Sequence, residues 1–322
     1  MRFDTVFIEK NIKNNKNTLN ILDKIKFKEL IYCEKYSEIF NPKNQNFRIQ
    51  KINPNIILAE KKKNFILKTP KNFSIGFSEN YYFSHMLNCL YDCKYCFLQG
   101  MFNSANYLIF VNYEDFLVEI KKILSTKKKR VCFFSGYDCD SLALEKITSF
   151  LKNFLKNFKN FHNGFIEIRT KSTKIDFFKN IKPMDNVIIA YSLNPEEIIN
   201  KFEQKTPSLS KRLESLKMLQ KLGWNIGLRF DPLINFIKNR EIYNTFFRQV
   251  FSKLDTSQIH SVTVGCFRMP NKFLQRLINI RPHDSLIFSQ LDKENTSEKE
   301  KIKKICKEEL ERLIDYKKVF FN

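Results

Sequence analysis

The stretch that decides the fold is Cys89-Leu90-Tyr91-Asp92-Cys93-Lys94-Tyr95-Cys96-Phe97, in which three cysteines stand at the spacing C-x3-C-x2-C. Three thiolates this close in sequence can bind three iron corners of a [4Fe-4S] cluster within one tight loop and leave the fourth iron open. A closed zinc site needs four protein ligands, and no cysteine or histidine follows at zinc-finger spacing. His85 lies just upstream and could complete a zinc set, so zinc stays open as an alternative.

Composition points to a folded protein with a polyanionic partner. The chain has 322 residues, of which 43% are hydrophobic, which allows one large barrel or two modest domains. Its formal net charge is +22, and such an excess favours a nucleic-acid partner. The competing explanation is codon bias, because the frequent Lys, Asn, Ile and Phe are all residues of A/T-rich codons.

The number of cysteines indicates in which cellular compartment the protein is expected. Eight cysteines without an apolar leader after Met1 predict a reducing cytoplasm rather than a secreted disulfide framework. No run approaches the ~18 apolar residues of a membrane span, so we expect no membrane partner.

Beyond residue 80, short apolar segments alternate with longer segments of helical periodicity. The predicted strands are Tyr82–Leu87, Arg130–Phe134, Phe165–Arg169, Val187–Ser192, Ile226–Phe230 and Val262–Phe267. The predicted helices are Tyr113–Ser125, Leu142–Phe158, Lys174–Asn180, Ser208–Leu222 and Arg240–Leu254. Because such alternation implies parallel strands joined by right-handed crossovers, the sequence predicts an α/β fold, a partial (β/α)6 barrel of TIM type.

The regions on either side of this barrel suggest three domains: an N-terminal accessory lobe at 1–80, the barrel at 81–269 and a C-terminal cap at 270–322. In the lobe, apolar spacing predicts a helix over Thr18–Phe40, and the partial alternation of Phe47–Ile52 resembles a strand. No chemistry can be assigned to the lobe. The tail predicts a charged helix over Thr296–Tyr316, and its Arg276, Arg281 and His283 are possible nucleic-acid contacts.

Polar residues follow each predicted strand, at the carboxyl-end face where β/α barrels place their working groups. They are the cysteine loop, Ser135–Ser141, Lys171, Ser192, Asn194, Asp231 and Arg268. We expect them to share one mouth, an arrangement that a zinc finger would not require, so it favours iron–sulfur.

At this point the chain resembles a known family. Cys89, Cys93 and Cys96, with an aromatic residue before the last cysteine, resemble the radical S-adenosylmethionine enzymes. The extension Tyr95-Cys96-Phe97-Leu98-Gln99 is similar to that of the spore photoproduct lyase family. Further similar stretches are Gly136–Glu145, Ser192-Leu193-Asn194 and Lys201-Phe202-Glu203 followed by Thr206, Lys211 and Arg212. The resemblance covers about 81–268.

The resemblance implies a chemistry that agrees with the ligand count. The open iron would bind S-adenosylmethionine, and an electron from a donor such as a flavodoxin or ferredoxin would release a 5′-deoxyadenosyl radical. In the family, this radical takes hydrogen from C6 of the thymine dimer called spore photoproduct in DNA, and two thymines are restored.

Roles for individual residues also come from the resemblance. Cys139 corresponds to the cysteine that quenches the thyminyl radical, and Tyr95 to a tyrosine that returns the hydrogen atom. Ser141, Lys171 and Ser192, with Asn194 beside them, correspond to residues that hold the polar end of S-adenosylmethionine.

Structural explanations compete with each of these roles. Cys139 could be an inert buried thiol, as we expect Cys132 and Cys266 to be. Tyr95 could pack on the cofactor, and the residues at strand ends could be ordinary strand caps.

Two departures from the family pattern stand out. Phe97 replaces a tyrosine of the hydrogen relay and has no hydroxyl group. Ser135-Gly136-Tyr137 occupies the place of the Gly-Gly-Glu run that many radical S-adenosylmethionine enzymes use to hold the methionine amine. Two other functions therefore stay open: the same radical chemistry on RNA, a peptide or a metabolite, and a zinc-stabilised nucleic-acid-binding protein.

Overall fold

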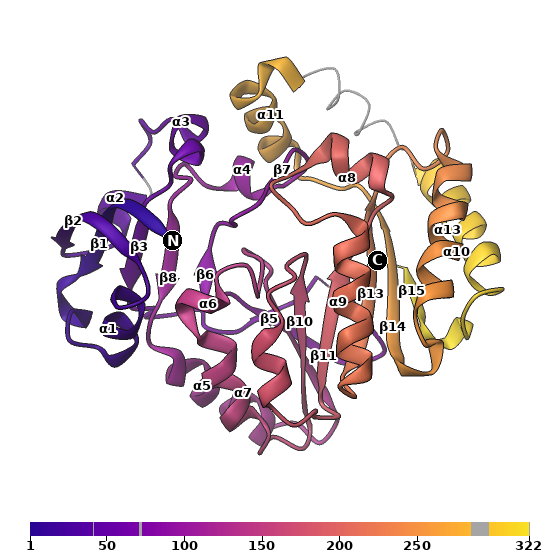
Figure 1. The fold of residues 1–322 in the computed structure, drawn as a ribbon, viewed down its shortest axis with the longest axis horizontal. Helices are drawn as coiled ribbons and strands as arrows, with labels where there is room; N and C mark the ends of the chain where they lie inside the picture. Colours follow the sequence, from indigo (N-terminus) through magenta and orange to yellow (C-terminus); the bar gives the residue numbers. More distant parts are fainter. Residues whose placement is uncertain (41, 71–72, 285–295, 322) are drawn as a thin grey trace.

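The computed structural model describes residues 1–40, 42–70, 73–284 and 296–321. Figure 1 shows a small sheet at the indigo, N-terminal end of the chain and a larger curled sheet beside it, with helices on the outer side of the larger sheet. No helix in these ranges combines the length and the apolar character needed to cross a bilayer.

The larger sheet is the barrel. Within the described residues it has eight strands in the order β15-β14-β13-β11-β10-β9-β5-β4. Seven of these described strands run parallel, and six of the seven form the barrel itself: β5 (Glu79–Phe83), β9 (Val131–Ser135), β10 (Gly164–Thr170), β11 (Val187–Ser192), β13 (Asn225–Leu233) and β14 (Ile259–Cys266). The short β4 (Leu67–Lys68) pairs antiparallel with β5, and β15 (Val319–Phe321) pairs parallel with β14. The predicted partial (β/α)6 barrel is confirmed.

Helices cover the outside of this sheet. They are α5 (Tyr113–Ser125), α6 (Glu145–Thr148), α7 (Phe150–Phe158), α8 (Glu196–Phe202), α9 (Leu209–Lys221) and α10 (Arg240–Lys253). Packing is largely aromatic: Phe83 of β5 contacts Phe116 of α5 and Phe154 of α7, with ring centroids 5.8 and 5.5 Å apart. This apolar layer fixes the strands and hence the positions of their carboxyl ends.

Two helix predictions differ from the structure. The predicted Leu142–Phe158 helix is two helices, because Ser149 adopts a left-handed backbone with φ of 49° and breaks it. The predicted Lys174–Asn180 helix is a 3-10 helix at Asp176–Asn180.

The cysteine loop is connected at each of its two ends to a strand of the smaller sheet. Its order is β2-β1-β3-β8-β6, formed by β1 (Arg2–Glu9), β2 (Lys26–Cys33), β3 (Ile56–Ala59), β6 (Met86–Leu87) and β8 (Tyr107–Phe110). The cysteines lie between β6 and β8. The predicted strand Tyr82–Leu87 was therefore wrong in its second half, since Met86 pairs with Ile109 in the smaller sheet.

The N-terminal predictions also need correction. The predicted Thr18–Phe40 helix is α1 (Lys16–Leu22), strand β2 and α2 (Ser37–Phe40), since residues 26–33 pair in register with β1. The segment Phe47–Ile52, which resembled a strand, is helix α3, and the side chain of Asn46 caps it by accepting from the N–H groups of Arg48 and Ile49.

The C-terminal part contains α11 (Asn271–Ile280), a 3-10 turn at Pro282–Asp284, α13 (Thr296–Leu310) and β15. It packs on the cysteine loop through α11 and the turn after it, and on β14 through α13 and β15. Helix α4 (Leu98–Met101), which directly follows the cysteines, approaches α11 so closely that a Cβ at Gly100 would collide with the backbone carbonyl of Phe273.

The barrel interior contains a buried ion cluster. Glu167 of β10 binds Arg229 of β13, with Oε2 at 2.7 Å from Nη2, and also Arg169, with Oε1 at 2.9 Å from Nε. Arg229 donates further to Ser261 of β14 at 2.9 Å. Cys132 is completely buried, as expected for a core residue.

Candidate cluster and cofactor site

The three cysteine thiols form one electrostatic group. Cys93 lies in the short strand β7 (Asp92–Cys93), which pairs antiparallel with β12 (Glu203–Gln204). Burial raises the pKa of the Cys89 thiol to about 12, and Cys96 acts on it in the same direction. Burial, with smaller effects from Cys96 and Cys89, raises the pKa of Cys93. The sulfurs of one loop thus lie close enough to sense one another.

The donor set fits a multi-iron cluster. The backbone of Tyr91 hydrogen-bonds to Cys89, and that of Leu98 to Cys96, contacts that lower the pKa of each thiol and would stabilise a metal-bound thiolate. Among the described residues, no group of three or more His, Cys, Asp and Glu side chains is arranged to hold a single metal ion.

His85 does not join the thiols. Its ring stacks on Phe150 of α7 with centroids 4.1 Å apart, and burial lowers its pKa to about 3. The zinc set of Cys89, Cys93, Cys96 and His85 is therefore not formed.

Two lysines from different parts of the chain act on the thiols. Lys51 of α3 donates from Nζ to the backbone carbonyl of Cys89, and its charge acts on Cys89 and Cys96. The charge of Lys171, after β10, acts on Cys93 and Cys96. Burial lowers the pKa of Lys51, while the neighbouring thiols and Asp92 oppose that shift.

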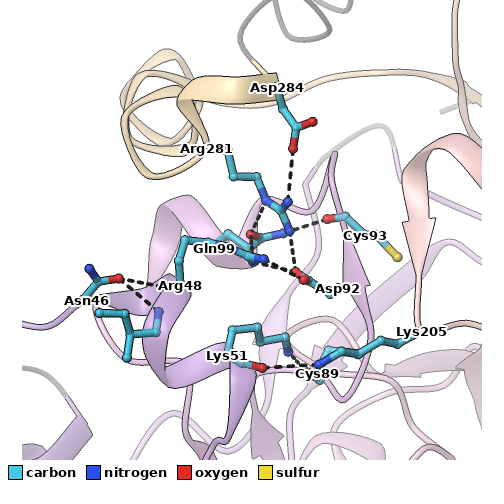
Figure 2. A network of polar contacts seen from close by, with 11 residues as sticks. Asn46, Arg48, Lys51, Cys89, Asp92, Cys93, Gln99, Lys205, Arg281 and Asp284 are labelled. Atoms are coloured by element: carbon cyan, nitrogen blue, oxygen red, sulfur yellow. Dashed lines mark hydrogen bonds and ion pairs between the residues drawn. The ribbon is translucent and has the colours of Figure 1, made fainter.

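Asp92 joins the cysteine loop to both chain ends (Figure 2). Its carboxylate accepts from Arg48 of α3 and from Arg281 after α11, at 2.5 Å for the latter. Arg281 also donates to Gln99 at 2.9 Å, and Gln99 donates to the carbonyl of Cys93 at 2.7 Å. Burial would raise the pKa of Asp92, but the two arginines lower it.

The tail residues have structural partners. Arg281 is only 7% exposed, and besides Asp92 it binds Asp284, which in turn pairs with Lys94 at 2.8 Å. Arg276 donates to Asn103. The expectation that Arg281 contacts nucleic acid was therefore wrong: its guanidinium supports the cysteine loop.

Glu203 brings several predicted site residues together. This carboxylate is completely buried and accepts from the hydroxyl of Tyr95, from Asn194 at 3.1 Å and from Arg212 at 2.5 Å. The Nζ of Lys171 lies 3.9 Å from it. Although burial alone would raise the pKa of Glu203, the charges of Lys171 and Arg212 lower it to about 2.

The loop after β9 is folded tightly around Asp140. Its carboxylate accepts from the N–H of Lys171 at 2.6 Å and from the hydroxyl of Thr170 at 2.7 Å. Gly136 turns the chain with φ of 82°, and a Cβ there would collide with the Oγ of Ser141. Ser141 is buried, and its hydroxyl lies 2.7 Å from that of Ser135.

Ser192, at the end of β11, is buried, and its backbone carbonyl accepts from Arg212 at 3.0 Å. Asp231 and Arg268, predicted at the fifth and sixth strand ends, bind each other at 3.0 Å. Cys266, expected in the core, is partly buried.

Cys139 lies beside the cysteine loop. It is 8% exposed, its sulfur accepts from the backbone of Met86, and burial, reinforced by Cys89, raises its pKa well above the usual range. The side chain is therefore an S–H group at neutral pH and carries a hydrogen atom close to the cluster loop.

The aromatic residues next to this loop form a partly exposed group. Tyr137 is 44% exposed, and its ring lies 5.7 Å from that of Phe97 and 4.4 Å from that of Tyr82. Phe97 thus has a tyrosine as its immediate neighbour.

Most of the residues that support the cysteine loop were not predicted from the sequence. Glu203 and Arg212 were quoted only for their resemblance, and Lys51, Arg48 and Asp92 received no role. The signal for Arg48 and Lys51 was their separation of three residues, which places both on one face of a helix, but Phe47–Ile52 resembled a strand.

Comparisons with known proteins identify relatives over nearly the whole chain. The family model described as spore photoproduct lyase matches residues 3–309. A spore photoproduct lyase from Bacillus subtilis is 27% identical over 197 residues, which are 60% of this chain and 56% of that protein. One from Clostridium acetobutylicum is 23% identical over 65% of this chain and 62% of its own length. The matched part thus spans little more than half of these curated relatives.

Solved structures share the fold. A spore photoproduct lyase double mutant with bound AdoMet (S-adenosylmethionine) and dinucleoside spore photoproduct has a TM-score of 0.81 at 15% identity, covering 99% of this chain and 98% of that one. A spore photoproduct lyase complexed with dinucleoside spore photoproduct has a TM-score of 0.80 at 14% identity, with the same coverage.

Proposed function

The chain belongs to the spore photoproduct lyase family, and from this membership we propose that it is a radical S-adenosylmethionine enzyme that repairs a thymine photoproduct in DNA. The observation that carries the proposal is that a fourth, buried thiol, Cys139, lies beside the three-thiol loop, where its sulfur accepts from the backbone of Met86. A cluster site alone would serve many reactions. A hydrogen-bearing thiol beside it suits a reaction that ends by quenching a carbon radical.

The cofactors are proposed from the donor set. Cys89, Cys93 and Cys96 would hold the [4Fe-4S] cluster, and Ser141, Lys171, Ser192 and Asn194 would bind S-adenosylmethionine. When bound, the two groups together supply the 5′-deoxyadenosyl radical that abstracts hydrogen from the substrate.

The hydrogen atom that completes the reaction would come from Cys139. Its sulfur keeps its proton because burial disfavours the thiolate, and a neutral S–H can donate a hydrogen atom. Tyr95, whose hydroxyl donates to Glu203, would return a hydrogen atom along the same path. Phe97 has no hydroxyl, so the relay in this chain passes through fewer groups than in relatives with a second tyrosine.

DNA is proposed as the partner. The net charge of +22 favours binding to phosphates, and the lesion would have to leave the base stack to reach the buried site, at a cost of a few kcal/mol that damage lowers. Neutralising about six phosphates gives a slope of about −5 for log affinity against log salt. An electron donor such as a flavodoxin or ferredoxin and a cytoplasmic location complete the proposal, because the ligand thiols must stay reduced.

The test is anaerobic reconstitution with iron and sulfide, followed by measurement of S-adenosylmethionine cleavage with lesion-bearing and undamaged oligonucleotides. We expect a brown protein with about four irons per chain that forms more 5′-deoxyadenosine with the lesion. The control is Cys93→Ala, which should bind little iron. A colourless protein with one zinc per chain would contradict the proposal.

A further inference from the structure

Lys51, a residue of helix α3, has a buried side chain beside the cysteine loop. Its side chain reaches away from its own helix to the cysteine loop, where Nζ donates to the carbonyl of Cys89 (Figure 2). The residue is 4% exposed, and Nζ also lies 5.6 Å from the centre of the Tyr107 ring. From the opposite side, Lys205 donates to the backbone carbonyl of Lys51 at 3.4 Å and holds this end of the helix in place.

Lys51 has no counter-ion of its own. Asp92, the carboxylate whose charge acts on Lys51, is already bound by Arg48 and Arg281. Within the described ranges, Lys51 forms hydrogen bonds and a ring contact but no ion pair. Because a buried ammonium without an anionic partner is strongly disfavoured, negative charge on the neighbouring sulfurs would stabilise the charged form of Lys51.

Lys171, the other lysine near the thiols, differs from Lys51 because it has a carboxylate nearby. Its charge acts on Cys93 and Cys96 of the same loop, but the carboxylate of Glu203 lies 3.9 Å from its Nζ. In the part of the chain that the structure describes, Lys171 thus has a carboxylate within ion-pair distance, whereas Lys51 does not. The groups that face Lys51 are the sulfurs of Cys89 and Cys96, which become anionic when they bind metal.

We propose that Lys51 compensates the negative charge of the cluster held by Cys89, Cys93 and Cys96 and thereby raises the reduction potential of that cluster. The inference rests on the function proposed above, because it requires the cluster. A thiolate-bound cluster gains one more negative charge on reduction, so a fixed cation beside it favours the reduced form. The N-terminal lobe would then contribute directly to electron acceptance.

The test is a potentiometric titration of the reconstituted full-length protein, in which the reduced cluster is quantified by electron paramagnetic resonance. The variants are Lys51→Met, which removes the charge, Lys51→Arg, which keeps it, and the exposed control Lys63→Met from the same lobe. At the wild-type midpoint, we expect Lys51→Met to lower the ratio of reduced to oxidised cluster about tenfold, or about 59 mV for one electron. Lys51→Arg and Lys63→Met should stay within about threefold of wild type.

Each other outcome counts against the inference. A Lys51→Met cluster with the wild-type midpoint overturns it while leaving the proposed function intact. An equal decrease in Lys51→Arg would assign the effect to packing and would also overturn it. If Lys51→Met binds no cluster, Lys51→Arg decides: loss of the cluster there too overturns the role of the charge. A wild-type protein that binds no [4Fe-4S] cluster overturns this inference and the proposed function together.

Discussion

Asp92 and Arg48 form a two-point ion pair, with Nη1 and Nη2 of the arginine 2.8 and 2.9 Å from the two carboxylate oxygens. Asp92 directly precedes the proposed ligand Cys93, whereas Arg48 belongs to helix α3 of the N-terminal lobe. Arg281 binds the same carboxylate from the C-terminal side. Segments from the N-terminal and C-terminal parts of the chain therefore hold the residue before this proposed ligand in position.

Asp92→Asn should destabilise the protein by about 3 kcal/mol, because it removes the buried charge that pairs with both Arg48 and Arg281 and leaves Arg281 only its longer ion pair with Asp284. The measurement is the urea midpoint of unfolding. Glu34→Gln is the matched control, since it breaks an exposed pair with Lys10 and should leave the midpoint nearly unchanged. Equal midpoints for Asp92→Asn and wild type would show that the contact contributes nothing to stability.

Gly100→Ala should also destabilise the protein, by about 1–3 kcal/mol, because the added Cβ meets the backbone of Phe273 and forces α4 away from α11. Thermal unfolding measures the effect. The adjacent Met101→Ala, at a position 38% exposed, should cost far less. If both variants melt at the same temperature, the two helices do not approach as closely as described.

The lowered pKa of Glu203 predicts how the stability of the protein changes with pH. Its folded-state pKa of about 2 lies below the ordinary value of 4.5, so its stabilisation is complete above pH 4.5 and is lost as the pH falls towards 2. In Glu203→Gln, stability should be lower by about 3–5 kcal/mol at neutral pH, because Arg212 loses its buried partner. The difference from wild type should shrink below pH 4.5, as unfolding at a series of pH values would reveal. A difference that is constant across this range would exclude an ionised Glu203.

Cys139→Ala should separate cofactor cleavage from repair. Without the S–H group, the protein should still convert S-adenosylmethionine to 5′-deoxyadenosine, but restored thymine should fall several-fold and misquenched adducts should appear. Chromatography with mass spectrometry measures both. Cys132→Ala removes another buried thiol of the same segment and should leave repair unchanged. Normal yields of thymine from Cys139→Ala would remove that residue from the proposed role.

The barrel could be predicted because each of its strands is a short apolar run between helical segments. Val187–Ser192 and Tyr113–Ser125 have the predicted bounds, since burial on the barrel sheet and an uninterrupted helical period leave little ambiguity. The smaller sheet could not be predicted. Its strand β2 has exposed residues at most positions, so alternation was absent, and β6 has only two residues.

The same limit applies to the site. Cys89, Cys93 and Cys96 lie within eight consecutive residues, and their spacing favoured an iron–sulfur cluster over zinc. Lys51 and Arg281 reach the loop from positions 38 and 189 residues away from Cys89 and Asp92, respectively, and no local pattern marks such contacts. Only the fold shows that the side chains of these basic residues bind the cysteine loop and do not extend into solvent.

The most direct test of the account is product analysis after anaerobic incubation of the reconstituted protein with S-adenosylmethionine, a reductant and DNA that contains spore photoproduct. The account predicts that the photoproduct disappears and that two thymines are recovered for each lesion lost, with no repair by Cys93→Ala. Photoproduct that persists unchanged while the protein cleaves S-adenosylmethionine would contradict the assignment of this substrate.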